Sequence, residues 1–251
     1  MTDQRFQAQN GAHPKVHLPE DQRVYAVGDI HGRLDLLLLL LDLIREDIAT
    51  QGPARNVVVF LGDYIDRGPQ SAGVIDLLES LTLPDAECVF LMGNHEKYMI
   101  DLMAEGGATD RWFENGGIAT LESYGIDHTL EADPLTENPI GAALWHALPN
   151  AHKTFLGTLK SSWRAGDVFF AHAGVDPDRP IDDQRTEDLI WIREAFLNSE
   201  KDHGPLIVHG HTPHYEPEVL RNRINVDTFA WQSNHLTAVV LENGQCRFLS
   251  T

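Results

Sequence analysis

The sequence predicts an α/β fold with two β-sheet regions in one domain. Strand and helix patterns alternate through the first part of the chain, which is typical of parallel strands joined by helices. The last third turns instead to closely spaced short strands. Hydrophobic residues make up 42% and charged residues 23% of the 251-residue chain, and this ordinary globular composition excludes a disordered or fibrous protein.

The first part of the chain follows a β-α-β-α-β-α pattern. Short apolar runs such as VYAVG and NVVVFLG, which are rich in β-branched residues, predict buried strands. The Leu-rich stretch at 33–50 is apolar nearly all round, so we expect a helix that is covered on both sides. The predicted strands are 24–28, 56–62 and 88–93, and the predicted helices are 33–50, 70–81 and about 96–105. This alternation favours a parallel sheet with helices packed against it.

The middle of the chain, at 107–160, predicts mainly helices, with glycine pairs at 106–107 and 116–117 as breaks. We expect residues 104–165 to form a helical insertion over one edge of the sheet. The last third predicts a helix at 186–198 and strands at 167–174, 206–210, 223–227, 236–242 and 246–250. Residues 1–22 contain two prolines and several glutamines and predict a loose arm, which precedes a single domain at 23–251.

The charge balance restricts the partners of the protein. Lys and Arg total 19 against 38 Asp and Glu, so the net charge is −19. Tight nucleic-acid binding depends on Lys and Arg that neutralise backbone phosphates, and the charge of this chain disfavours it. If the protein handles a phosphorylated substrate, the positive charge has to be local, from a few arginines or from bound metal.

Cysteine content and hydropathy bear on the cellular compartment. Cys88 and Cys246 are the only cysteines and do not resemble a disulfide framework, which favours a reducing compartment. The first twenty residues are polar and contain no apolar targeting core. The longest apolar run, Leu36 to Leu41, is far shorter than the roughly 18 residues of a membrane helix. We therefore expect a cytoplasmic protein with no membrane partner.

Each of the first three predicted strands ends in a glycine that is followed at once by polar residues. These blocks are GDIHG at 28–32, GDYIDRGP at 62–69 and GNHE at 93–96. Ligands of open α/β sheets bind outside the carboxyl ends of parallel strands, so the three blocks are expected to share one crevice. The glycines suit tight turns and a close approach of the backbone.

The side chains in these blocks are hard or borderline metal ligands. They are the carboxylates of Asp29 and Asp63, the imidazole of His31 and the amide oxygen of Asn94, with no thiolate. This mixture suits Mn, Fe or Zn. More imidazoles follow predicted strands in the last third, at His172 in FFAHAG and at His209 and His211 in IVHGHT. The two-residue spacing of the last pair does not decide which of them faces the metal, because Gly210 can break the strand.

The ordered set GDIHG, GDYIDRG, GNHE, a lone His after the FFA strand and HGHT resembles a known family. The set is similar to the calcineurin-like metallophosphoesterases of the phosphoprotein phosphatase type, and most similar in character to bacterial and phage serine/threonine phosphatases. The resemblance covers residues 24 to 215 approximately. It implies the metallophosphoesterase four-layer fold, in which two mixed β-sheets pack together and are flanked by helices.

The resemblance also implies a pair of divalent metal ions, with Mn²⁺ expected first and Fe or Zn as alternatives. By this match Asp63 bridges the two ions, Asp29 and His31 complete one site, and Asn94, His172 and His211 complete the other. His209 is then an orienting residue. Two metals ~3.5–4 Å apart clamp the attacking and leaving oxygens of a phosphoryl group. In similar enzymes a metal-bridging hydroxide attacks phosphorus directly, without a phospho-enzyme.

The match further implies a general acid and a phosphate clamp. His95 protonates the leaving alcohol, paired with Asp66, and a carboxylate that holds an imidazole suits this role. Arg67 matches the phosphate clamp, and Asn94 also contributes to phosphate binding. Arg193, in DLIWIREAF, resembles a second phosphate-binding arginine of bacterial relatives. An arginine on such an apolar helix is also typical of a solvated face.

The resemblance leads to competing hypotheses for the function. The first is a metal-dependent phosphomonoesterase, a serine/threonine protein phosphatase that acts on phosphorylated proteins or small phosphoesters, with 104–165 shaping the substrate rim. The alternative is a hydrolase of diadenosine tetraphosphate, or of capped RNA ends. The GNHE and DRG forms favour the phosphatase. A third hypothesis, a phosphate-recognising module without activity, is disfavoured because every matched ligand and the general acid are present.

Overall fold

The computed structural model describes Pro14 and residues 16–105, 109–129 and 138–251. It contains two mixed sheets of five strands each. The order of the first sheet is β10 (Gln245–Ser250), β9 (Thr237–Glu242), β1 (Gln22–Val27), β2 (Arg55–Phe60) and β3 (Ala86–Phe90). The order of the second sheet is β4 (Ser162–Ala165), β5 (Val168–Ala171), β6 (Leu206–His209), β8 (Arg223–Asn225) and β7 (Glu218–Val219).

Both sheets contain three neighbouring parallel strands, so the carboxyl ends of these strands lie together at one edge of each sheet. In the first sheet β1, β2 and β3 are parallel, and in the second sheet β5, β6 and β8 are parallel. Antiparallel strands complete the edges, with β9 and β10 in one sheet and β4 and β7 in the other. The predicted parallel sheet is confirmed, and the short strands β4 and β7 are additions that the sequence pattern did not indicate.

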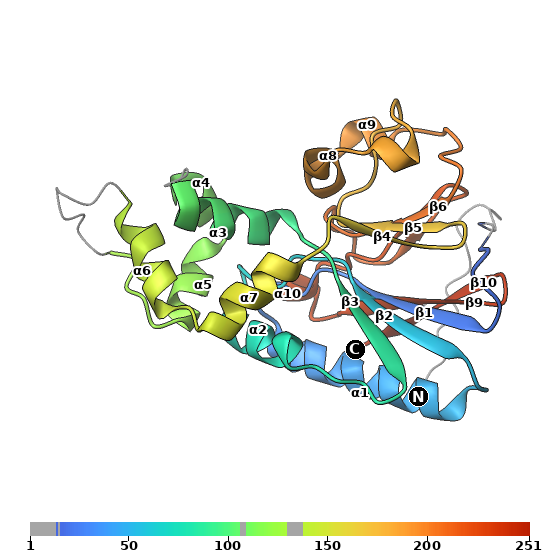
Figure 1. Cartoon of the computed structure of the whole chain (residues 1–251), viewed down its shortest axis with the longest axis horizontal. Helices are drawn as coiled ribbons and strands as arrows, with labels where there is room; N and C mark the ends of the chain where they lie inside the picture. The colour runs from blue at the N-terminus through green and yellow to red at the C-terminus, as the bar shows by residue number, and fades with distance from the viewer. Residues whose placement is uncertain (1–13, 15, 106–108, 130–137) are drawn as a thin grey trace.

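Alternation along the strands creates the four predicted layers. Val24 and Ala26 of β1 face the second sheet, where they join a core that includes Phe170 of β5. Tyr25 and Val27 face the opposite side and pack against helices. The helices on that side are α1 (Leu34–Thr50) and α2 (Ser71–Glu79), which lie below the first sheet in Figure 1. Burial on both faces explains why these strands are apolar throughout rather than alternating.

The outer face of the second sheet is covered by α8 (Thr186–Trp191) and α9 (Glu194–Leu197). The prediction of a single helix at 186–198 is therefore wrong, because the chain leaves the helical path between these two elements. Arg193 has φ −132° and ψ −103° at this break. The break lets Phe196 turn into the core against Ile207 of β6.

A group of helices projects from the edge of the first sheet beside β3, as Figure 1 shows. They are α3 (Asn94–Glu105), α4 (Thr109–Glu114), α5 (Gly117–Ser123), α6 (Pro139–Ala147) and α7 (Asn150–Thr158). The mainly helical character predicted for 107–160 is confirmed. The break at 106–107 falls outside the described residues, and the break at 116–117 separates α4 from α5.

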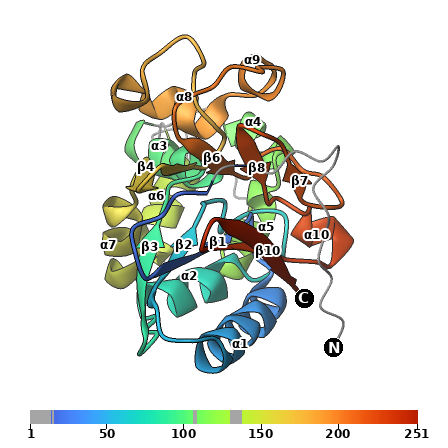
Figure 2. The ribbon, with the colours of Figure 1, turned by 90° about the vertical axis from the view of Figure 1, so that its right-hand side faces the viewer.

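Helix α1 differs from the expectation that both of its sides are covered. Leu37, Leu40 and Leu41 are fully buried against the first sheet, but Leu38 and Leu39 are 45% and 56% exposed. The run of leucines winds round the helix, and only one side meets the sheet (Figure 2).

The N-terminal segment was predicted to be a loose arm over 1–22, and most of it lies outside the described residues. Its described end is packed, since Val16 is buried and His17 O accepts a hydrogen bond from Asp167 N at 2.8 Å. The remaining short elements are a 3₁₀ turn at Ile181–Asp183 and the helix α10 (Ala230–Ser233). Among the described helices, none reaches the combination of length and hydrophobicity that crossing a bilayer requires.

Candidate active site

The polar residues that follow the strands of both sheets meet at one site. Asp63 follows β2, Asn94 and His95 begin α3 after β3, and His172 and His211 follow strands of the second sheet. All five side chains are buried. A Cβ added at Gly93 would lie 2.1 Å from Asp63 Oδ1, so only glycine permits this approach of the two strand ends.

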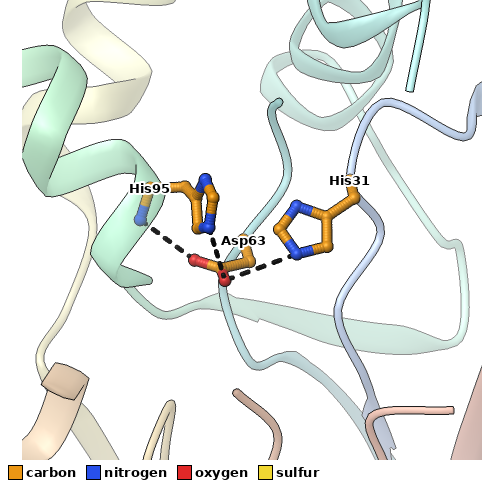
Figure 3. Close-up of side chains that lie close together, drawn as sticks. All are labelled: His31, Asp63 and His95. Atoms are coloured by element: carbon orange, nitrogen blue, oxygen red, sulfur yellow. Dashed lines mark hydrogen bonds and ion pairs between the residues drawn. The ribbon is translucent and has the colours of Figure 1, made fainter. Parts of the chain in front are cut away.

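Asp63 lies at the centre of the site, as Figure 3 shows for its contacts with His31 and His95. Its Oδ2 atom lies 3.6 Å from His31 Nε2, 3.8 Å from His95 Nε2 and 3.3 Å from His172 Nε2. Its Oδ1 atom accepts a hydrogen bond from the backbone N–H of His95 at 3.1 Å. One carboxylate therefore belongs to both groups of potential ligand atoms in the site.

The first of these groups consists of His31, Asp63 and His95. His31 Nδ1 lies 2.9 Å from the carbonyl oxygen of Ile65, which can only accept a hydrogen bond. The proton of a neutral His31 therefore belongs on Nδ1, and the lone pair of Nε2 points towards Asp63. An imidazole lone pair that faces a carboxylate fits a cation held between them.

The second group consists of Asp63, His172 and His211, with Asn94 beside it. His172 Nε2 lies 2.9 Å from Asn94 Oδ1 and 3.2 Å from His211 Nδ1. Because His172 Nδ1 contacts the carbonyl oxygen of Leu61 at 3.1 Å, its Nε2 atom also presents a lone pair. Acceptors converge here, and the residues present therefore fit a metal ion.

The predicted ligand Asp29 lies at this site but outside both groups. Its two carboxylate oxygens accept the backbone N–H of His211 at 3.2 and 3.0 Å. Burial, and then the nearby carboxylate of Asp227, raise the pKa of Asp29 well above its usual value. Asp227 lies just after β8 and was missed, because it was placed inside the predicted strand 223–227 and lacks the preceding glycine that marked Asp29 and Asp63. A cluster of buried carboxylates of this kind requires compensating positive charge.

Several residues of the site hold backbone conformations that side chains rarely adopt. The φ angles in the left-handed region are 46° at His31, 53° at Asp63, 72° at Asp66, 67° at Arg67 and 65° at His211. Each such residue costs of order 1 kcal/mol or more, and such costs concentrate where function fixes the chain.

His95 and Asp66 form a buried pair. His95 Nδ1 and Asp66 Oδ2 are 2.6 Å apart, and Arg67 Nη2 lies 3.5 Å from His95 Nε2. Burial alone would lower the pKa of His95, but the carboxylates of Asp63 and Asp66 outweigh it and raise that pKa above its usual value. The imidazole is thus held in one orientation, with its Nε2 atom facing the centre of the site.

Helices α4 and α5 hold this pair from the other side, which sequence reasoning missed. Trp112 Nε1 donates to Asp66 Oδ2 at 2.8 Å, and Thr120 Oγ1 donates to Asp66 Oδ1 at 2.6 Å. The turn between the helices contributes too, since Gly116 O accepts the backbone N–H of Arg67 at 3.1 Å. The partners are separated by 46 and 54 positions in the chain, so no local pattern could indicate them.

Glu96 is a further residue whose role the sequence did not show. It is fully buried, and its carboxylate accepts four backbone N–H groups. Oε2 accepts from Asp63 and Gly93, both at 2.9 Å, and Oε1 accepts from Tyr64 at 2.8 Å and from Ile65 at 3.4 Å. Glu96 therefore ties the end of β2 to the start of α3 and fixes the position of Asp63.

Residues 22–241 match the family model of the calcineurin-like phosphoesterases. The chain belongs to this family. As a family member it is a metallophosphoesterase, a hydrolase for which divalent metal ions are implied, and the two groups around Asp63 are suited to binding them. The resemblance inferred from the ordered sequence blocks is confirmed.

Two relatives cover most of this calcineurin-like chain. A serine/threonine-protein phosphatase 1 from Salmonella typhimurium is 30% identical over 93% of this chain and 94% of its own length. A bis(5'-nucleosyl)-tetraphosphatase PrpE (asymmetrical) from Anoxybacillus flavithermus is 28% identical over 85% and 88%. Among solved structures, a cold-active protein-tyrosine phosphatase from a Shewanella species shares the fold, with a TM-score of 0.57 at 17% identity over 92% of this chain and 80% of its own.

Two further residues that the sequence analysis singled out, Arg193 and His209, lie in different surroundings, one exposed and one buried. Arg193 is exposed at the α8–α9 break. Burial lowers the pKa of His211, and the charges of His172 and Arg193 lower it further. His209 is buried against the ring of Phe196 at 5.1 Å, and its Nδ1 lies 3.0 Å from the carbonyl oxygen of Gly210. The structure thus places Arg193 near the site and His209 beside it, within the core of the second sheet.

Proposed function

We propose that this chain hydrolyses phosphate monoesters, with phosphoserine and phosphothreonine of proteins as substrates. The observation that carries the proposal is the position of Asp63 Oδ2 between two groups of ligand atoms, with the His95–Asp66 pair beside it. This arrangement has a shared carboxylate for two cations and a proton donor within the same small volume.

The proposed metal ligands combine members of the two groups with Asp29 and Asn94, which lie beside them, while His95 of the first group is assigned a different role. Asp63 would be shared by both ions, Asp29 and His31 would hold one ion, and Asn94, His172 and His211 would hold the other, with Mn²⁺ as the first candidate. When bound, the two ions supply Lewis acidity that lowers the pKa of water and neutralises charge on the phosphoryl group. The Nδ1 atom of His211, which lies 3.2 Å from His172 Nε2, is the atom that would face an ion in the second group.

The proton for the leaving alcohol is assigned to Nε2 of His95. The other ring nitrogen is occupied by Asp66 at 2.6 Å, so the imidazole can give up a proton only from the atom that faces the site. Arg67, which lies 3.5 Å from that atom, is positioned to bind a phosphoryl oxygen next to the departing group. We assign Arg193 to the same task, with Asn94 as a further phosphate contact.

The relatives support two substrate classes. The Salmonella typhimurium protein is named as a serine/threonine-protein phosphatase, and the Anoxybacillus flavithermus protein as a bis(5'-nucleosyl)-tetraphosphatase. The buried acid His95 favours an alkyl phosphate monoester, because an alkoxide leaves only when protonated. Dinucleoside tetraphosphate hydrolysis is the second candidate, and exposed aromatic rings beside Arg67 favour it.

The test is a side-by-side assay of p-nitrophenyl phosphate, a phosphothreonine peptide and diadenosine tetraphosphate. The protein is stripped with chelator and assayed with and without Mn²⁺, Fe²⁺ or Zn²⁺. His95→Asn is compared with His146→Asn, which changes an exposed histidine of α6. We expect metal-dependent turnover of the peptide that only His95→Asn lowers, by roughly 10²-fold or more. A strong preference for the tetraphosphate would replace the first substrate with the second, and no turnover with any metal would refute the proposal.

A further inference from the structure

Three aromatic rings lie together beside the site, on segments that the functional blocks do not include. Tyr215 and Phe229 meet with ring centroids 5.9 Å apart, and Phe229 and Trp231 meet at 5.1 Å, both edge to face. Tyr215 is 68% exposed and Trp231 is 36% exposed. We call these three rings the aromatic shelf. Exposed large aromatic residues that gather in this way are typical of a binding surface.

The shelf is held in place by the fold. Phe229 has φ 61°, a value that a bulky side chain adopts only when its surroundings impose it. Its backbone N–H donates to Asp227 Oδ1 at 2.9 Å, and Arg33 Nη1 donates to the carbonyl oxygen of Ala230 at 3.0 Å. The buried Asp227 therefore links the shelf directly to the carboxylates of the site.

The shelf is also continuous with the phosphate clamp. The guanidinium carbon of Arg67 lies 5.4 Å from the centre of the Trp231 ring, a cation–π contact. The same guanidinium lies 3.5 Å from His95 Nε2. When the phosphoryl group of a ligand binds at Arg67, the neighbouring chemical group of that ligand can therefore contact the aromatic shelf.

We propose that the aromatic shelf stacks the nucleobase of a nucleotide whose phosphate is bound at Arg67. The occupant must carry an anion and a flat ring joined by a short linker, and a nucleotide always satisfies this, because one ribose separates its base from its phosphate. The net charge of −19 disfavours a long polyanion, so the ligand is a small nucleotide rather than RNA. The proposal rests on the proposed function only for the phosphate position.

A pair of ligands that differ only in the base tests the proposal. Adenosine 5'-monophosphate and ribose 5-phosphate carry the same phosphate and sugar. Their dissociation constants are measured by titration calorimetry with Mn²⁺ present, in the His95→Asn background so that neither ligand is consumed. Because base stacking on aromatic side chains strengthens binding roughly 5- to 150-fold, we expect the adenosine ligand to bind tighter by a factor in that range.

The shelf variants then identify the rings. Tyr215→Ala combined with Trp231→Ala should bring the two dissociation constants within about twofold of each other, by loss of stacking. Tyr215→Ala alone should lower the ratio partly, and this exposed position keeps the test valid if the double variant does not fold. Trp145→Ala is the matched control, because Trp145 is 52% exposed on α6, where it lies under Lys153 Nζ at 4.5 Å. This control should leave the ratio unchanged.

Each contrary result has a distinct meaning. Equal affinities in the starting protein, or a ratio that the shelf variants do not lower, would overturn the nucleobase assignment while phosphatase activity stands. Failure of the unsubstituted chain to hydrolyse any phosphate ester with any added metal would refute the proposed function separately. A phosphothreonine peptide whose binding improves with a neighbouring Trp, and loses that gain in the shelf variants while the nucleotides show no difference, would assign the shelf to peptides instead.

Discussion

Trp112 donates its indole N–H to the Asp66 carboxylate across 2.8 Å, and that same oxygen holds Nδ1 of His95. A helix that borders the site is thereby connected to the group proposed to deliver a proton. The carboxylate is fully buried, so water does not replace a donor that is removed.

Trp112→Phe tests this connection, because it keeps a large ring and removes only the donor. We expect kcat for a phosphothreonine peptide to fall roughly tenfold, since a less firmly held His95 protonates the leaving oxygen less well. Turnover of p-nitrophenyl phosphate should fall less than about threefold, because nitrophenolate leaves without a proton. Trp145→Phe on α6 is the control. An equal fall for both substrates would indicate a purely structural role for Trp112.

Glu96→Gln tests the link between the end of β2 and α3. The amide group would face backbone N–H donors with donors of its own, and a buried unmatched donor costs about 1–3 kcal/mol. We expect a lower free energy of unfolding in urea and a Mn²⁺ affinity that is weaker by roughly 10- to 100-fold, because Asp63 loses its support. Glu87→Gln, at an exposed position of β3, should change neither quantity. Unaltered Mn²⁺ affinity in Glu96→Gln would contradict the positioning of Asp63 by this carboxylate.

Gly93→Ala tests how closely the strand ends approach. The new Cβ would lie 2.1 Å from Asp63 Oδ1 and 2.3 Å from Asp63 N, so the backbone has to move. We expect loss of most Mn²⁺ binding, measured by calorimetry, and a lower melting temperature. Gly52→Ala has open space around the added carbon and serves as the control. Retained metal binding in Gly93→Ala would show that the approach is not required.

Metal removal should destabilise the folded chain. Asp29, Asp63, Asp227 and Glu96 are buried close together, and burial raises the pKa of Asp29 and Asp227, the latter to about 6. Binding of cations to the folded state alone stabilises it by mass action, by about 2.7 kcal/mol at a hundredfold excess over Kd. Differential scanning calorimetry should therefore show a higher melting temperature with added Mn²⁺. Asp29→Asn should gain less from Mn²⁺ than the unsubstituted chain does, and an identical gain would exclude Asp29 as a ligand.

The sequence predicted the parallel strands and the convergence of their ends because these depend on local patterns. GDIHG, GDYIDRG and GNHE each combine a strand end with a glycine and a polar side chain, and the fold brings them together as expected. The contacts of Trp112 and Thr120 with Asp66 were beyond such reasoning, because tertiary packing alone joins segments this distant. The helix break at Arg193 was missed because the burial of Phe196 in the core overrides the local helix propensity there, and this packing is not visible in the sequence.

The contacts of Trp112, Gly116 and Thr120 with Asp66 and Arg67 mean that the helices proposed to shape the substrate rim also position the pair proposed to deliver the proton. Without these contacts, the helical rim could be replaced to change the substrate and leave the proposed general acid unaffected. In this chain, a replacement segment without an indole at position 112 and a hydroxyl at position 120 would remove two hydrogen bonds from Asp66. It would therefore disturb the proposed general acid His95 as well as the contacts with the substrate. We therefore expect that variants of this segment selected for a different substrate keep Trp112 and Thr120 and differ at positions that do not contact Asp66.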